Sequence, residues 1–143
     1  MFQAVDPKIE RLRTVGLFAN LHHGDLRRVG RLVSEVERPA GTILIREDAH
    51  GAEAFVIRSG TVRVEHDGVP IARLGAGEIV GEFALIDQRP RSATAVAETD
   101  VALLVLSTGD FDRLVDEVPA VARRLLAVLA GRVRAANHTL DRA

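Results

Sequence analysis

The apolar residues of this chain change their spacing twice, and these two changes constrain its fold more than any other feature of the sequence. Near the start they recur at helical steps, as in Ile9, Leu12 and Val15. Between residues 42 and 107 they alternate with polar residues or form short runs bounded by glycine, which is typical of β-strands. A helical spacing returns at Thr108. We therefore predict helices, then a strand-rich middle, then helices again.

Local signals indicate where these elements end. Asp67 followed by Gly68 predicts a tight hairpin turn, because glycine accepts the positive φ of such turns. Pro119 predicts the start of a long final helix. Pro39 and Gly41 would end the second helix, which the apolar spacing predicts upstream of them. The apolar residues of that second helix are Leu26, Val29, Leu32, Val33 and Val36.

These elements predict an α+β domain that is mainly β: an antiparallel β-roll or jelly roll of about eight strands, with helices at both ends. A chain of 143 residues fits one domain of ordinary size. We expect a single domain over residues 1–143, with N-terminal helices over 1–40, the roll over 41–107 and C-terminal helices over 108–143.

The composition excludes several classes of protein. Hydrophobic residues make up 47% and charged residues 27% of the chain, which is the balance of a folded globular protein. The net charge of −1 gives no long-range attraction to nucleic acids or anionic membranes. The absence of cysteine excludes disulfides and thiolate metal sites. Because the sequence has neither an apolar run of about 18 residues nor the apolar core of a secretory signal, we expect a cytoplasmic domain without membrane insertion.

The segment 75–95, GAGEIVGEFALIDQRPRSATA, interrupts the strand pattern with glycines and a short helical pattern. Gly81 would let the backbone come close to a ligand, and the helical turn that starts at Glu82 would point free amides at an anion. Arg91 follows Glu82 by nine residues across a turn, so both side chains can face one cavity. Arginine binds phosphate with a planar set of donors, whereas an ionised glutamate accepts hydrogen bonds from hydroxyl groups. A ligand with a ribose hydroxyl beside a cyclic phosphate satisfies both side chains.

These residues resemble the phosphate-binding cassette of cyclic-nucleotide-binding domains, the family found in catabolite activator proteins, cyclic-nucleotide-gated channels and kinase A regulatory subunits. The family pattern is Gly-Glu, three apolar or small residues, a variable loop, and Arg-Ser/Thr/Ala-Ala. We call residues 77–95 the cassette, and the resemblance extends over roughly residues 15–140. The matching residues here are Gly81, Glu82, Phe83, Ala84, Leu85, Pro90, Arg91, Ser92 and Ala93.

The resemblance implies a role for each of these positions. Glu82 would bind the ribose 2′-hydroxyl, and Arg91, with the groups around Ser92 and Ala93, would bind the cyclic phosphate. On the final helix, Arg132 matches an arginine that approaches the base in activator proteins, and Asn137 stands in a pair of positions that carries threonine and serine there. The residues expected to form the binding site are Gly81, Glu82, Phe83, Ala84, Arg91, Ser92 and Ala93 with the apolar walls Val64, Ile71, Leu74 and Val80 and with Arg132 and Asn137.

The function implied is that of a sensor that binds a cyclic nucleotide and transmits binding through movement of its C-terminal helix. Ser92 favours cAMP over cGMP, because a threonine after the cassette arginine often accompanies cGMP preference in this family. We expect no direct nucleic-acid binding, because activator-type regulators continue with a DNA-binding domain of which this sequence holds no part. Two alternatives stay open: a nucleotide-free β-roll interaction module, and the truncated sensor half of a DNA-binding transcription regulator.

The remaining residues predict neither catalysis nor a metal site. Ser92 lacks a histidine base within a recognisable nucleophile motif, and the five histidines are dispersed along the sequence. The final helix carries two apolar stripes, of which one would pack on the roll and the other would form a homodimer seam or a lid over the nucleotide. An effector protein or domain outside this chain is the other expected partner. The stripes are Leu126, Leu129, Val133, Ala136 and Leu140, and Val121, Leu125 and Val128.

Overall fold

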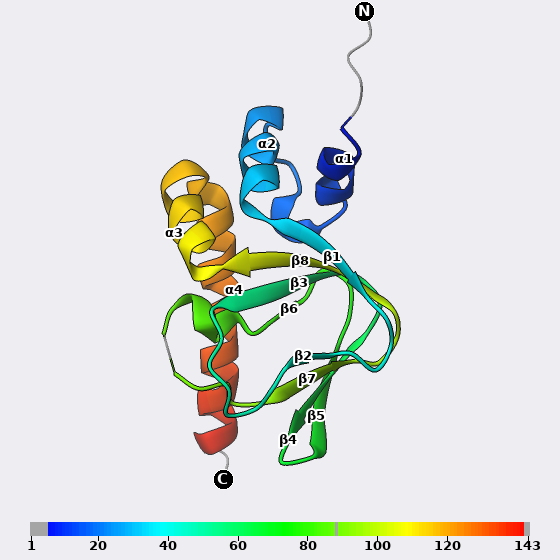
Figure 1. Cartoon of the computed structure of the whole chain (residues 1–143). Helices are drawn as coiled ribbons and strands as arrows, with labels where there is room; N and C mark the ends of the chain where they lie inside the picture. Colours follow the sequence, from blue (N-terminus) through cyan, green and yellow to red (C-terminus); the bar gives the residue numbers. More distant parts are fainter. Residues whose placement is uncertain (1–5, 88, 142–143) are drawn as a thin grey trace, which may run out of the picture.

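The computed structural model describes residues 6–87 and 89–141, with side chains through Arg134 (Figure 1). Helices stand at both ends of the described chain and strands fill the middle, as the spacing of apolar residues predicts. The helices are α1 (Pro7–Arg13), η1 (Gly16–Phe18), α2 (His23–Leu32), η2 (Glu82–Leu85), α3 (Thr108–Glu117) and α4 (Pro119–Asp141). The helices η1 and η2 are single 3₁₀ turns. None of the described helices combines the length and apolar character needed to span a bilayer.

The strands form two four-stranded antiparallel sheets, with orders β1-β8-β3-β6 and β2-β7-β4-β5. This arrangement confirms the predicted α+β class with an antiparallel roll. At the tight turn between β4 and β5, Asp67 and Gly68 both have positive φ, of 50° and 78°. The strands are β1 (Ser34–Arg38), β2 (Ile43–Ile45), β3 (Glu53–Ser59), β4 (Val62–His66), β5 (Val69–Leu74), β6 (Ile79–Val80), β7 (Thr94–Ala97) and β8 (Val101–Ser107).

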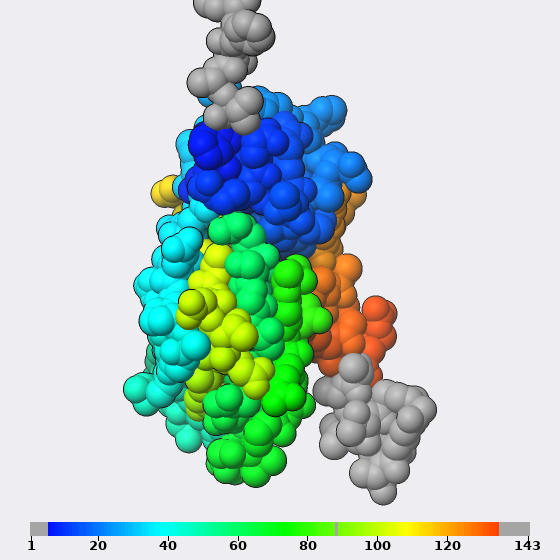
Figure 2. All heavy atoms as spheres, turned by 90° about the vertical axis from the view of Figure 1, so that its right-hand side faces the viewer, coloured from blue at the N-terminus to red at the C-terminus, as the bar shows by residue number. Residues whose placement is uncertain are grey.

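The sheet β1-β8-β3-β6 lies between the helices and the second sheet, and β8 shows this most clearly. Leu104 and Leu106 of β8 pack in the apolar cluster that contains the helical residues. Val101 and Leu103 of the same strand pack in the cluster between the two sheets. Because alternate residues of a strand point to opposite faces, β8 is buried on both sides. Figure 2 shows the N-terminal helices above the strand-rich part of the chain, with α4 along one edge.

Residues 34–38 correct the predicted boundary between the helices and the roll. The second helix was predicted to extend through Val36, but α2 ends at Leu32 and the next residues form β1. Val36 follows Leu32 by four residues, so it satisfies a helical spacing, and the sequence alone does not separate this from a strand. Pairing decides the outcome: Val36 lies opposite Leu103 in the register with β8. The roll therefore begins at residue 34 instead of 41.

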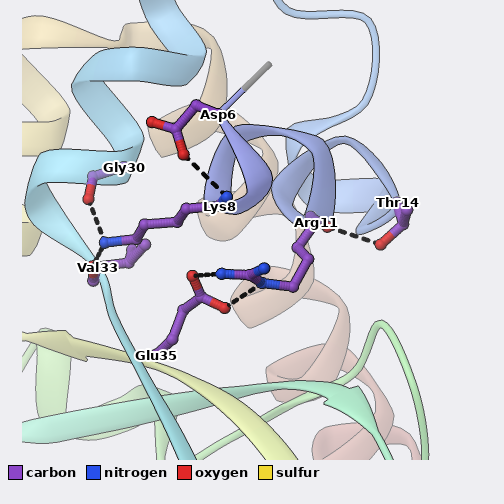
Figure 3. A network of polar contacts seen from close by, with 7 residues as sticks. All are labelled: Asp6, Lys8, Arg11, Thr14, Gly30, Val33 and Glu35. Atoms are coloured by element: carbon purple, nitrogen blue, oxygen red, sulfur yellow. Dashed lines mark hydrogen bonds and ion pairs between the residues drawn. The ribbon is translucent and has the colours of Figure 1, made fainter. Parts of the chain in front are cut away.

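A polar network fastens α1 to the rest of the domain (Figure 3). Arg11 donates from Nε and Nη2 to the two carboxylate oxygens of Glu35 in β1, at 2.6 and 2.7 Å. This bidentate hydrogen bonding lowers the pKa of Glu35 and raises that of Arg11. Lys8 donates from Nζ to the backbone carbonyls of Gly30 and Val33, at the C-terminal end of α2. The network thus joins α1 to both a helix and a strand.

The start of α4 at Pro119 is confirmed, whereas the predicted division of its apolar residues into one packed and one free stripe is wrong. Ser107 caps α3 by accepting a hydrogen bond from the Asp110 amide. The buried side of α4 takes residues from both predicted stripes, because Val121, Leu125 and Leu129 are buried. Leu126, Val128 and Val133 lie on the exposed side, and the side chains of Ala136 and Leu140 are outside the described residues.

Arg124 connects α4 to the N-terminal part of the chain. Its Nη1 donates to the carbonyls of Leu17 and Ala19, each at 2.8 Å. Ala19 directly follows η1, and Leu17 is within it. The long final helix is therefore fastened to the N-terminal turn before it runs past the sheets toward the cassette.

Candidate functional site

A cavity of about 420 Å³ lies between the cassette, the sheet β2-β7-β4-β5 and α4. Strands β4 and β5 provide an apolar wall, η2 and the segment after it provide the polar side, and Arg132 reaches in from α4. The structure brings together in this lining every predicted site residue whose side chain it describes. These are Val64, Ile71, Leu74, Val80, Gly81, Glu82, Phe83, Ala84, Arg91, Ser92, Ala93 and Arg132. Asn137, the remaining predicted residue, has its side chain outside the described residues.

Gly81 stands at the tight point between β6 and η2. Its φ of 79° and ψ of 19° are left-handed, a conformation that residues with a Cβ atom rarely adopt. A Cβ atom at this position would lie 2.8 Å from Arg91 Nη1 and 2.8 Å from the Ile45 side chain. The sequence predicted a glycine that admits a ligand, whereas the structure shows that this glycine admits the Arg91 guanidinium.

Glu82 is the one charged residue that is buried in the described part of the chain, with 3% of its surface exposed. Its Oε1 lies 2.8 Å from Nη1 of Arg132, which also donates from Nη2 to the Ile79 carbonyl at 2.7 Å. A buried carboxylate is costly unless a nearby cation compensates it, and Arg132 supplies that cation. The partner of Glu82 in this structure is therefore Arg132 of α4 and not Arg91.

Arg91 is held by backbone carbonyls from two different segments. Its Nη1 donates to Gly81 O at 3.2 Å and its Nη2 donates to Glu53 O at 2.6 Å. Burial lowers the pKa of the Arg91 guanidinium, and the nearby carboxylates of Glu53 and Glu82 act in the opposite direction. Because its described partners are uncharged carbonyls, its positive charge is available to an anion in the cavity.

The segment of residues 48–53, which leads from the loop after β2 into the first residue of β3, forms a cradle for Arg91 that the sequence reasoning missed. The amide of Arg91 donates to Ala49 O, and the amide of Asp48 donates to Arg91 O, each at 2.8 Å. Gly51 lies against the guanidinium, where a Cβ atom would come within 2.5 Å of Nη2. The sequence gives a single sign of this cradle, the glycine at position 51, which lies 40 residues before Arg91. No local sequence pattern connects the two residues.

The polar lining of the cavity has an excess of positive charge. It contains the three arginines Arg89, Arg91 and Arg132 and the two acids Glu82 and Asp87. Arg89 and Asp87 were not among the predicted site residues. This balance favours a ligand with one negative charge, and the apolar strand residues favour a ligand that also has an apolar or aromatic part.

Comparisons with known proteins agree with this geometry. The family described as "Cyclic nucleotide-binding domain" matches residues 35–118, which is more than half of the chain. The chain belongs to the cyclic nucleotide-binding domain family. The match contains the whole cassette together with β2 to β8, α3 and all of β1 after its first residue.

Individual relatives of this cyclic nucleotide-binding domain are found in proteins with different outputs. It is 36% identical to the Pycsar effector protein XpPycTIR of Xanthomonas perforans, over 77% of this chain and 36% of that protein. It is 39% identical to the cyclic AMP receptor protein of Thermus thermophilus, over 72% of this chain and 50% of the receptor. The chain spans half or less of the length of these two curated relatives.

A solved structure extends the likeness to three dimensions. The catabolite activator protein of Thermus thermophilus superposes on the domain with a TM-score of 0.78 and 35% identity. The superposition covers 87% of this chain and 61% of that one. It includes most of this domain, so the fold is shared.

One polar cluster beside the cassette was not expected from the dispersed histidines. His66 at the end of β4 lies near Glu47 and Asp67, with separations of 3.5 and 3.4 Å. Its Nδ1 is also 3.2 Å from the Ser92 carbonyl. The three side chains have the ligand types and spacing of a metal site, with His66 and Asp67 exposed and Glu47 half-buried. The predicted absence of a metal stays a prediction.

Proposed function

We propose that this domain is a sensor of 3′,5′-cyclic AMP and that it binds the nucleotide in the cavity between Arg91 and Glu82. The observation that carries the proposal is the pairing of two opposite groups in one cavity: a guanidinium bonded to carbonyls and a buried carboxylate. Cyclic AMP has one negative charge, a ribose hydroxyl and an aromatic base. The cavity of about 420 Å³ falls in the usual range of small-molecule sites, about 300–1,000 Å³.

Arg91 is positioned to receive the cyclic phosphate. Its two hydrogen bonds to carbonyls leave further guanidinium N–H groups for a ligand within the described surroundings. Charge-assisted bonds of this type contribute about 1.5–3 kcal/mol each. Ser92 and Ala93 follow Arg91 in the lining and add a hydroxyl and an amide on the same side. These groups together favour a phosphate over a neutral ligand.

Glu82 is suited to the ribose 2′-hydroxyl because an ionised carboxylate only accepts hydrogen bonds. Arg132 forms its ion pair with Oε1 of Glu82, and the other carboxylate oxygen can accept a hydrogen bond from a hydroxyl group. A carboxylate beside a phosphate would ordinarily repel it, and the charges of Arg91 and Arg132 offset this repulsion. We therefore assign the ribose to Glu82 and the phosphate to Arg91.

The preference for cyclic AMP over cyclic GMP is a further part of the proposal. It is supported by Ser92, and by a relative that is named a cyclic AMP receptor. The base is expected to lie toward α4, where Arg132 and Asn137 stand five residues apart in the sequence. The apolar residues of β4 and β5 would cover its face.

Transmission of binding is proposed to run through α4, because Arg132 connects this helix directly to the ribose-binding carboxylate. A nucleotide that contacts both the cassette and α4 binds the closed arrangement more tightly and shifts the population toward it. The effector that responds to this change in population is proposed to be a protein or domain outside this chain. The exposed Leu126 and Val133 of α4 support a homodimer as another output.

Binding without catalysis, and a cytoplasmic location, belong to the same proposal. Among the described residues, the cluster of Glu47, His66 and Asp67 near the cassette lies outside the cavity lining. The nucleotide is therefore proposed as a regulatory ligand that the domain binds and releases without chemical change. The alternatives are a nucleotide-free interaction module and the sensor part of a DNA-binding regulator.

The test is calorimetric titration of cAMP, cGMP and 2′-deoxy-cAMP into the chain after removal of copurified nucleotide. We expect saturable binding of cAMP, and a Kd that rises by about ten- to a hundredfold for Arg91→Ala, the cost of a charge-assisted bond. Arg73→Ala is the matched control, because Arg73 lies on β5 outside the cavity lining and pairs with Glu98. The deoxy analogue should bind weakly to the wild-type chain. No binding of any cyclic nucleotide at millimolar concentration would leave the interaction module as the better interpretation.

A further inference from the structure

Thr108, the first residue of α3, touches two segments of the binding site without lining the cavity. Its amide donates to Ala52 O at 2.9 Å. Its hydroxyl oxygen lies 3.1 Å from Ala84 O and 3.2 Å from Ala52 O, so a single O–H is shared between two carbonyls. The cap of α3 is the neighbouring Ser107. The Thr108 hydroxyl is therefore not required to start its own helix.

The two carbonyls belong to the parts that hold the two key side chains. Ala52 lies in the 48–53 cradle, which binds the backbone and guanidinium of Arg91 through its neighbours in the loop. Ala84 lies in η2, the 3₁₀ turn that begins with Glu82. One hydroxyl thus fixes the distance between the element that orients Arg91 and the element that carries Glu82.

The same residue connects these two elements to the helices that would report binding. The helix α3 leads through Val118 into α4, and α4 returns to η2 through the ion pair of Arg132 with Glu82. The turn η2 is therefore held by both of these helices: by Thr108 at the start of α3 and by Arg132 in α4. A displacement of η2 acts on both contacts.

We propose that Thr108 is a positioning residue for cyclic-nucleotide binding, acting through the Arg91 cradle and η2. This inference rests on the proposed function of the cavity. Thr108 makes no contact with the ligand. It sets the separation of Arg91 and Glu82 before the nucleotide arrives, and it passes the movement of η2 to α3.

The experiment compares Thr108→Val, Thr108→Ser and Thr14→Val by calorimetry with cAMP. Valine keeps the shape of threonine and the amide bond to Ala52 but removes the hydroxyl. Serine keeps the hydroxyl. Thr14 is the matched control, because its hydroxyl also bonds a carbonyl, Arg11 O, in α1, away from the cavity (Figure 3). We expect a rise of about tenfold in Kd for Thr108→Val, the equivalent of one net hydrogen bond, recovery in Thr108→Ser and no change in Thr14→Val.

A second readout separates positioning from a loss of overall stability. The Arg91 Nε–H resonance in a ¹H–¹⁵N spectrum of the unliganded chain should shift in Thr108→Val and return in Thr108→Ser. If Thr108→Val fails to fold, Thr108→Ala gives the same comparison. Wild-type affinity in folded Thr108→Val, with binding still lost in Arg91→Ala, would overturn the role of Thr108 and leave the proposed function intact. Absence of cAMP binding by the wild-type chain would overturn both.

Discussion

At the scale of single residues, the site depends on two glycines, Gly51 and Gly81, that let the Arg91 guanidinium lie against the backbone. The chemical nature of Glu82 and Arg91 and their spacing could be predicted, because both fall in one short segment of unusual sequence. Their partners could not be predicted. Arg132 follows Glu82 by 50 residues, and the partners of Arg91 are backbone carbonyls, which carry no sequence signature.

Gly51→Ala tests the Arg91 cradle at this scale. The new Cβ atom would come within 3 Å of three atoms of the guanidinium, which is the far end of a flexible side chain and can move aside. We therefore expect a small change in stability but a rise of about tenfold or more in the Kd for cAMP, as one charge-assisted bond is misplaced. Gly75→Ala is the control, because an added Cβ atom there meets no atom within 4 Å. Equal affinities of the two variants in calorimetry would contradict the cradle.

At the scale of elements, most helices and strands were predictable because their apolar spacing is distinctive. The exception, residues 34–38, shows the limit: Val36 fits both periods, and only its pairing with β8 selects the strand. The buried side of α4 was beyond prediction for a similar reason. The spacing allows either apolar stripe to be buried, and the structure buries Val121 and Leu125 of one stripe together with Leu129 of the other.

The ion pair between α4 and η2 gives a prediction for these elements. Arg132→Ala leaves the buried Glu82 carboxylate without its cation, which should lower the free energy of unfolding by about 1–3 kcal/mol. Urea unfolding of the unliganded chain measures this. Arg134→Ala, an exposed arginine on the same helix, is the control. Adding Glu82→Gln to Arg132→Ala should restore part of the loss, and an unchanged stability of Arg132→Ala would show that the pair has no structural role.

At the scale of the whole molecule, the N-terminal helices are joined to the roll by the bidentate pair of Arg11 with Glu35. The pKa of Glu35 is lowered in the folded state, so its stabilisation is complete above the ordinary carboxyl pKa of 4.5. That stabilisation is lost as the pH falls below 4.5 and through the lowered folded-state pKa. Glu35→Gln should therefore lower the melting temperature at pH 7 by a few degrees.

The same variant should differ less from the wild-type chain near pH 3 than at pH 7, since the stabilisation by the charged carboxylate decreases as the pH falls below 4.5. Thermal unfolding monitored by circular dichroism at the two pH values measures the difference. Glu10→Gln provides the control, because its pair with Arg13 is exposed and confined to one helix end. A Glu35→Gln effect that is as large in acid as at neutral pH would show that packing, and not charge, is responsible.

The burial of β8 on both faces has a consequence for how the molecule opens. Its side chains belong to both apolar clusters, so neither the helices nor the second sheet can separate without exposing one side of this strand. The amide protons of β8 should exchange with solvent only through global unfolding, whereas residues 89–93 of the cassette, which lie outside the strands, should also exchange through local openings. We therefore expect a slow-exchanging centre beside a site that can open locally, so that a ligand can enter without unfolding of the whole domain.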